Sequence, residues 1–303
     1  MGGLEFAGYA LLGAVAGLLA GLLGIGGGVV VVPGLLWLFH AGGLPPERLT
    51  QLAVATSLAA IILTAAVSTA AHHRRRAVAW RLVCRLAPGL VAGAILGAWL
   101  ADRLSSDALR RVFGVFELLV AWHLWRARPD ATGEPGTKDA VGESARALAP
   151  SSGTRPRSIS GSSVGSSPGS VEPSLMTAAG GVIGTLSSLV GIGGGTLTTP
   201  LLLWCGVGLR RAIATSAACG LPIALAGTLA HVAAGWDDVT PTADGAYWGY
   251  YWGYLYWPAL LVLAPSAMVT APWGVRLAHG LPLDFLRRLF ALLLAVVGLG
   301  LLR

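Results

Sequence analysis

A five-residue glycine motif interrupts two long apolar segments of this chain. The motif Gly-Ile-Gly-Gly-Gly occupies Gly24–Gly28 and returns at Gly191–Gly195, at an offset of 167 residues. A glycine weakens a helix by roughly 1 kcal/mol relative to alanine, so each cluster predicts a break in a helix. Broken helices at membrane depth are tolerated only where they are buried in protein or line a cavity. The two motifs therefore predict two special points inside a membrane protein.

Composition indicates a polytopic membrane protein of the all-α class. The chain has 303 residues, of which 54% are hydrophobic and 12% are charged, whereas soluble domains carry about 25% charged residues. Several apolar runs are long enough to span a bilayer as helices. The net charge of +7 comes from basic residues in short loops between apolar runs, as membrane topology requires, and this distribution weighs against a nucleic-acid partner.

The apolar runs are arranged in two halves. In the first half the glycine motif separates residues 6–23 from residues 29–39. At ~1.5 Å per residue the second run is too short to cross a ~30 Å hydrocarbon core, so we expect a re-entrant helical hairpin with its tip inside the membrane. The first run is long enough to span, which leaves a fully crossing hairpin as the alternative. Three full spans follow, near residues 49–71, 82–101 and 109–125.

The second half repeats the first after a segment of different composition. Residues 127–173 are rich in Ser, Gly, Pro and Thr and predict a disordered cytoplasmic linker. The linker separates membrane repeat 1 (residues 1–126) from membrane repeat 2 (residues 174–303). The matching positions include Pro33 with Pro200, Thr56-Ser57 with Thr215-Ser216, and His72 with His231.

Charge indicates that the two repeats face opposite ways. One loop of repeat 1 carries Arg74–Arg76, whereas its counterpart in repeat 2 carries Asp237, Asp238 and Asp244. Under the positive-inside rule these loops lie on opposite sides of the membrane. We therefore predict two inverted repeats, each with a Gly-broken re-entrant hairpin and three transmembrane helices, as in many secondary transporters.

The hairpin tips are the predicted substrate site. A tip presents unpaired N–H groups and a helix N-terminus, which favour an anion. Tight helix packing is the alternative explanation for the glycines, and bonding to the i−4 carbonyl is the alternative for the hydroxyls. The predicted substrate-binding residues are Gly26, Gly27, Gly28, Thr56, Ser57, Gly193, Gly194, Gly195, Thr196, Thr215 and Ser216.

Three further residues are candidates for gating or coupling. His72 and His231 each lie 16 residues beyond a paired Thr, near the end of a span, where an interfacial or capping role competes with proton handling. Glu117 is the carboxylate well inside a span, and it either relays a coupling proton or makes a satisfied polar contact. The aromatic segment 247–257 is typical of an interfacial belt, with an outer lid as the alternative.

The doubled glycine motif, each copy followed by a Pro and by an Ala-Thr-Ser segment ending near a His, resembles the TauE/SafE family of sulfite exporters. The resemblance covers both membrane halves and excludes the linker. It implies a multi-pass permease of the bacterial cytoplasmic membrane that moves sulfite or related sulfur-containing anions and organosulfonates. It places the glycines, prolines and paired hydroxyls nearest the translocation path.

The sequence therefore predicts a secondary transporter of a small sulfur anion, working by alternating access, with protons as a candidate coupling ion. The alternatives are an anion channel of the same fold and a non-transporting membrane scaffold. No enzyme activity, cofactor or metal site is expected, since the glycine clusters lack the Lys-Ser/Thr of a nucleotide-binding loop.

Overall fold

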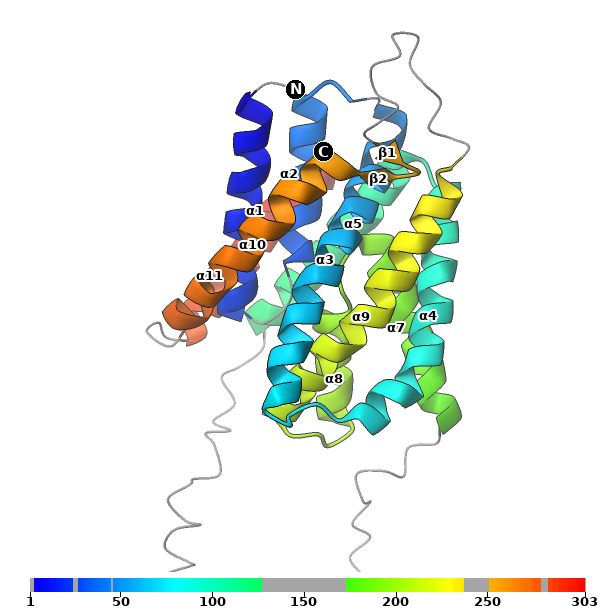
Figure 1. Ribbon diagram of the computed structural model, residues 1–303, viewed down its shortest axis with the longest axis vertical. Coiled ribbons are helices and arrows are strands. Elements are labelled where there is room, and N and C mark those ends of the chain that lie inside the picture. The colour runs from blue at the N-terminus through cyan, green and yellow to red at the C-terminus, as the bar shows by residue number, and fades with distance from the viewer. Residues whose placement is uncertain are drawn as a thin grey trace, which may run out of the picture.

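A computed structural model describes residues 3–23, 27–44, 46–126, 173–236, 251–278 and 283–302 of the chain. The described part is almost entirely helical (Figure 1). The first half holds α1 (Gly3–Leu23), α2 (Gly28–Ala41), a 3₁₀ turn η1 (Pro46–Arg48), α3 (Leu49–Arg74), α4 (Trp80–Arg103) and α5 (Ser106–Arg126). The second half holds α7 (Pro173–Val190), α8 (Gly195–Trp204), α9 (Leu209–Ala234), α10 (Trp257–Ala278) and α11 (Leu283–Leu302).

The helices follow the predicted apolar runs. Three described segments are long and apolar enough to cross a membrane, namely Pro46–Arg74, Trp80–Arg103 and Arg211–Ala234. The predicted linker lies outside the described residues except for Pro173, which begins α7. The helical membrane architecture expected from the sequence is thus present.

Both predicted helix breaks are present. α1 ends at Leu23 and α2 begins at Gly28, while α7 ends at Val190 and α8 begins at Gly195. In the second break Gly191 and Gly194 have φ of +70° and +72°, a left-handed conformation that side chains other than glycine adopt at a cost. Figure 1 shows α1 and α2 in the upper part of the view and α8 in the lower part.

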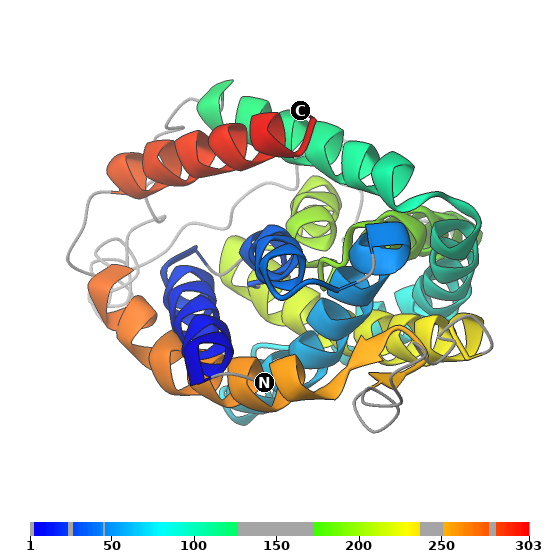
Figure 2. The same cartoon turned by 90° about the horizontal axis from the view of Figure 1, so that it is seen from above.

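The main helix pairs join the two halves. α1 packs along α10, α7 packs along α4, α3 packs against α9, and α5 packs against α11. Figure 2 shows α1 beside α10 on one side of the bundle and α5 beside α11 along another. Each half therefore finds its main packing partners in the other half.

Glycines set the separation in two of these pairs. Gly89, Gly93 and Gly97, one turn apart on α4, face the backbone oxygens of Thr177, Gly181 and Thr185 on α7. Gly13 and Gly17 of α1 face the backbone of α10 in the same way. Small residues at such spacing let transmembrane helices approach closely, which increases van der Waals contact where no hydrophobic driving force acts between helices.

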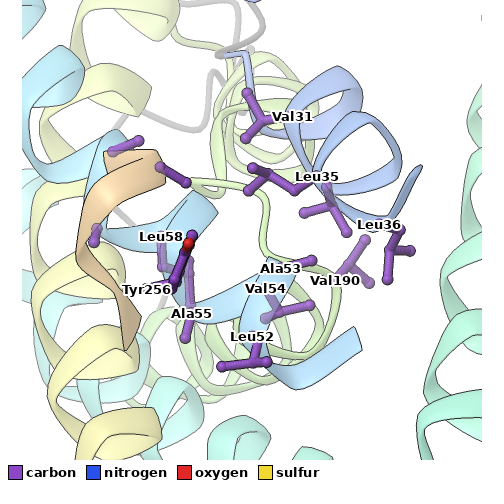
Figure 3. Packing of buried hydrophobic residues seen from close by; sticks show 14 of the residues in the cluster. Val31, Leu35, Leu36, Leu52, Ala53, Val54, Ala55, Leu58, Val190 and Tyr256 are labelled. Carbon is purple, nitrogen blue, oxygen red and sulfur yellow. The ribbon is translucent and has the colours of Figure 1, made fainter. Parts of the chain in front are cut away.

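The interior is filled where α2, α3 and the end of α7 meet. Val31, Leu35 and Leu36 of α2 point toward the α3 segment around Val54 in Figure 3, with Val190 beside them. Leu35, Val54 and Leu58 are fully buried. This cluster fixes α2 and the second glycine break against the first half of α3.

The aromatic segment differs from the prediction of an interfacial belt. Tyr251–Trp252 (β1) and Leu255–Tyr256 (β2) form a two-stranded antiparallel hairpin, with Gly253 at φ +53° in its turn. Tyr254 and Tyr256 are buried, and Trp252 is exposed. The tyrosines point inward because the hairpin packs on α3 and α9. Residues 247–250 lie outside the described part.

Candidate functional site

The second glycine motif forms a compact turn between α7 and α8. The Ile192 N–H donates to the Ser187 carbonyl at 3.0 Å, and the Gly194 N–H donates to the Ile192 carbonyl at 2.6 Å. Gly194 then caps α8, and it accepts hydrogen bonds from the N–H groups of Leu197 and Thr198. The first N–H groups of a helix lack intrahelical acceptors. This turn (Gly191–Gly195) is called the second tip below. The backbone N–H donors at the start of α8 therefore lie at the second tip.

The two glycine motifs lie against each other and share one neighbour on α3. A Cβ on Gly28 would lie 2.6 Å from the Gly191 carbonyl oxygen and 3.0 Å from Ile61 Cδ1. A Cβ on Gly193 would lie 2.6 Å from Ile61 Cγ2. Ile61 stands halfway along α3, and Gly220, whose Cβ would approach the Gly193 oxygen at 2.8 Å, stands near the middle of α9. The motifs thus meet near the midpoints of the two long helices.

The first motif is described in part. Gly26 lies outside the described residues, together with Gly24 and Ile25, so its predicted contact with substrate stays a prediction. Gly27 caps α2, and a Cβ there would lie 3.2 Å from the Ala16 oxygen of α1. Backbone atoms of neighbouring segments lie close to the Cβ positions of Gly27 and Gly28, which accounts for glycine at these positions.

Two of the predicted hydroxyls bind the second tip. Ser57 of α3 donates to the Gly191 carbonyl at 2.9 Å, and Ser216 of α9 donates to the Gly195 carbonyl at 3.1 Å. These equivalent serines of the two halves therefore fix the tip from opposite helices. Both side chains are buried.

The paired threonines bind elsewhere. Thr56 Oγ1 accepts a hydrogen bond from the Tyr256 N–H at 3.2 Å, and Thr215 Oγ1 accepts one from the Ala79 N–H at 3.0 Å. Tyr256 and Ala79 directly precede α10 and α4. Each threonine thus stabilises the start of a helix in the other half. This structural role was not predicted. In both hydrogen bonds the threonine oxygen is the acceptor.

Two further serines precede the second tip on α7, and the first of them, Ser187, lies beside it. Ser187 and Ser188 of α7 are 1% and 0% exposed, and neither Oγ has a hydrogen-bond partner among the described residues. Ser187 Oγ lies 3.4 Å from the position of a Cβ on Gly194, whereas Ser188 Oγ lies 3.1 Å from that of a Cβ on Gly227. The predicted Thr196 hydroxyl is also buried without a partner in the described part, and Thr198 bonds back to the Gly194 carbonyl at 2.8 Å.

The candidate coupling residues do not gather at the tips. His72 is half-buried in the last turn of α3. His231 is fully buried in the last turn of α9. Its Nδ1 lies 2.8 Å from the Gly227 carbonyl oxygen, and because that oxygen can only accept, Nδ1 carries the proton.

Glu117 is buried on α5 where α5 crosses α11. A Cβ on Gly298 would lie 3.3 Å from Glu117 Cβ, and neither carboxylate oxygen has a partner among the described residues. The alternative expectation for Glu117, a polar partner that satisfies its carboxylate, is therefore not met among the described residues. Leu294, which lies 177 residues after Glu117 and takes its place in the second half, is fully buried as well.

A polar cluster closes one end of the bundle. Tyr254 donates to Asp102 Oδ1 at 2.7 Å, and Arg48 Nη1 lies 3.9 Å from the same oxygen. The Arg48 guanidinium also lies 5.7 Å from the centre of the Tyr254 ring. These contacts tie η1, α4 and the β-hairpin together.

The chain belongs to the TauE/SafE family. The family model described as "Sulfite exporter TauE/SafE" matches residues 9–301, which include both glycine motifs. The fold and the family together define a membrane transporter.

Relatives agree with this class. The chain is 30% identical over 291 residues to a "probable membrane transporter protein" of Haemophilus influenzae, covering 96% of this chain and 95% of the relative. It is 28% identical over 250 residues to the "probable membrane transporter protein" YunE of Bacillus subtilis, covering 79% and 84%. A relative in Methanocaldococcus jannaschii is 24% identical over 293 residues, covering 96% and 93%. No solved structure matches the chain.

Proposed function

We propose that this protein is a secondary transporter of sulfite or a related sulfur-containing anion across the cytoplasmic membrane. The observation that carries the proposal is the contact between the two glycine motifs near the midpoints of α3 and α9. Backbone N–H groups at the start of α8 and nearby hydroxyls supply hydrogen-bond donors without formal charge. Such donors hold an anion and still release it, as a carrier requires. The family's printed description as a sulfite exporter supports the choice of cargo.

The two halves act as inverted repeats in this proposal. The pairs α1–α10 and α7–α4 occupy equivalent places in the two halves, which supports a two-fold relation. α2 and α8 have 14 and 10 residues, or about 21 and 15 Å of helix, short of the ~30 Å hydrocarbon core. Each glycine hairpin therefore turns back inside the membrane. Alternating access follows when one half rocks against the other about the shared site.

The experiment is flux into proteoliposomes that contain the purified protein. Uptake of labelled sulfite, thiosulfate and an organosulfonate is measured with and without a pH gradient. A carrier gives saturating flux and counterflow of labelled substrate. Flux that rises without saturation and shows no counterflow indicates a channel of the same fold, and no flux of any sulfur anion contradicts the proposal.

Proton coupling is assigned to Glu117 in this proposal, because the carboxyl group lies inside the membrane without a described partner. Glu117→Gln keeps the shape of the side chain and removes its ability to carry a proton. We expect the variant to keep flux down a substrate gradient and to lose part of the response to a pH gradient. An unchanged response excludes Glu117 as the coupling group.

A further inference from the structure

The two glycine tips differ in the side chains that surround them. At the second tip Ser187 and Thr196 supply buried hydroxyls, whereas the equivalent residues of the first half, at the offset of 167, are Ala20 and Val29. An anion that needs donors is therefore better served at the second tip. This asymmetry is a property of the side chains, because the glycine motifs themselves are identical.

Ser187 is the hydroxyl with the strongest indication of a ligand. It is 1% exposed, and its Oγ has no hydrogen-bond partner among the described residues. The same Oγ lies beside Gly194, the residue that caps α8. A buried polar group without a partner loses its hydration without compensation, and such groups are rare in native proteins. An anion bound at the start of α8 would accept this hydrogen bond.

The surroundings of the second tip carry no positive charge from the helices that form it. α7 and α8 contain no Lys or Arg, and those of α3 and α9 lie at helix ends, at Arg74 and at Arg210-Arg211. Ile61 and Ile223 cover the tip from α3 and α9. A ligand here leaves water for a site of neutral donors and aliphatic walls.

Neutral donors in an apolar site discriminate by charge. The energy needed to dehydrate an ion grows with the square of its charge, so a dianion loses about four times as much as a monoanion of equal size. Hydrogen bonds from neutral groups increase less steeply with the charge of the acceptor. A site without a compensating cation therefore favours the monoanion.

We propose that the second tip selects a sulfonate group bearing a single negative charge, with Ser187 as a hydrogen-bond donor to it. The cargo is then an organosulfonate or hydrogen sulfite, and the dianions sulfite and sulfate are excluded. This inference rests on the transport function proposed above, and it specifies the ionic form that the site accepts.

Competition in proteoliposomes tests the charge selection. Methanesulfonate is a monoanion and sulfate a dianion throughout the accessible pH range, and both are added against labelled sulfite without a pH gradient. We expect methanesulfonate to compete and sulfate to fail. Equal competition by sulfate overturns the inference of charge selection. Saturable sulfite flux in the same vesicles would still support the proposed transport function. Absence of saturable flux for every anion removes the transport function itself.

The pH dependence supplies a second readout. Near neutral pH sulfite is a mixture of the dianion and hydrogen sulfite, so lowering the pH on both sides of the membrane raises the share of the monoanion. We expect the half-saturating concentration of total sulfite to fall with that share. The same constant for methanesulfonate should stay unchanged, which separates ionisation of the substrate from titration of the protein. A constant value for total sulfite contradicts the inference.

Ser187→Ala tests the donor, with Ser188→Ala as the matched control. Both serines are buried without a described partner, but Ser188 faces Gly227 and not the tip. Loss of a hydrogen bond to a charged ligand should raise the half-saturating concentration for methanesulfonate about tenfold or more in Ser187→Ala alone. The ligand-free protein should keep its thermal stability, because the removed hydroxyl has no described partner. Equal effects of the two substitutions, or no effect of Ser187→Ala, overturn the role of Ser187.

Discussion

Ile61 packs against both glycine motifs. Its Cδ1 faces Gly28, and its Cγ2 faces Gly193. A side chain on Gly28 would push Ile61 and the backbone of the second motif, and a side chain on Gly193 would push Ile61. Close packing therefore explains these glycines, in addition to the broken helices that the sequence indicated: Gly28 packs against the second motif and Ile61, and Gly193 packs against Ile61.

The first prediction concerns Gly28. A methyl group there would lie 2.6 Å from the Gly191 carbonyl oxygen, a distance that backbone atoms cannot relieve without separating the two motifs. Gly28→Ala should abolish most of the flux in proteoliposomes and lower the melting temperature in detergent. Gly208→Ala is the control, because nothing lies within 4 Å of its Cβ position. Wild-type flux in Gly28→Ala would show that contact between the motifs is not needed.

The second prediction concerns Thr215. Thr215→Val keeps the shape of the side chain and leaves the Ala79 N–H without its acceptor, which should cost about 1–3 kcal/mol. The apparent melting temperature should fall. Thr64→Val provides the comparison, because Thr64 bonds only to carbonyls of its own helix in the described structure. Equal stability of the two variants would argue against a structural role for the hydrogen bond from the Ala79 N–H to Thr215.

At the scale of single residues, part of the candidate site could be predicted from the sequence. Ser57 and Ser216 were predicted to belong to the substrate site, because they recur at matching positions of the two halves. Thr56 and Thr215 recur in the same way, but repetition alone does not distinguish a substrate contact from a cap between halves. Ser187 was missed because a serine within an apolar helix is most often satisfied by its own i−4 carbonyl.

At the scale of elements, α4 and α7 are the pair most dependent on glycine. Gly89, Gly93 and Gly97 present a smooth face to the α7 backbone. Gly93→Leu should force the two helices apart and destabilise the protein by about 2 kcal/mol or more, since overpacking a close interface strains both partners. Ala92→Leu is the control, because Ala92 is exposed on the other side of α4. The two variants are compared by melting temperature and by recovery of monodisperse protein.

Helix positions were largely predictable, whereas the aromatic segment was not. The apolar runs and glycine breaks are local signals, so α2, α3 and α4 begin and end close to their expected positions. The inward orientation of Tyr254 and Tyr256 depends on a tight turn at Gly253 and on the hydrogen bond from the Tyr256 N–H to Thr56. That partner lies 200 residues away, and composition alone gives no sign of it.

At the scale of the whole molecule, the two halves depend on each other. Met1–Arg126 and Pro173–Arg303, expressed as separate chains, should form a transporter when produced together. Each half alone should aggregate or be degraded, because α1 lacks α10 and α4 lacks α7. Co-purification through a tag on one half, followed by flux measurement, tests this expectation. A monodisperse, stable single half would contradict it.

The pairing of α1 with α10 has a consequence for biosynthesis. α1 meets its partner only after the helices that lie between them in the chain, α2 to α9, have been made. During that interval the glycine face of α1 is open to lipid or to the insertion machinery. Final assembly must therefore follow translation of the second half, so a truncated nascent chain cannot acquire the native arrangement.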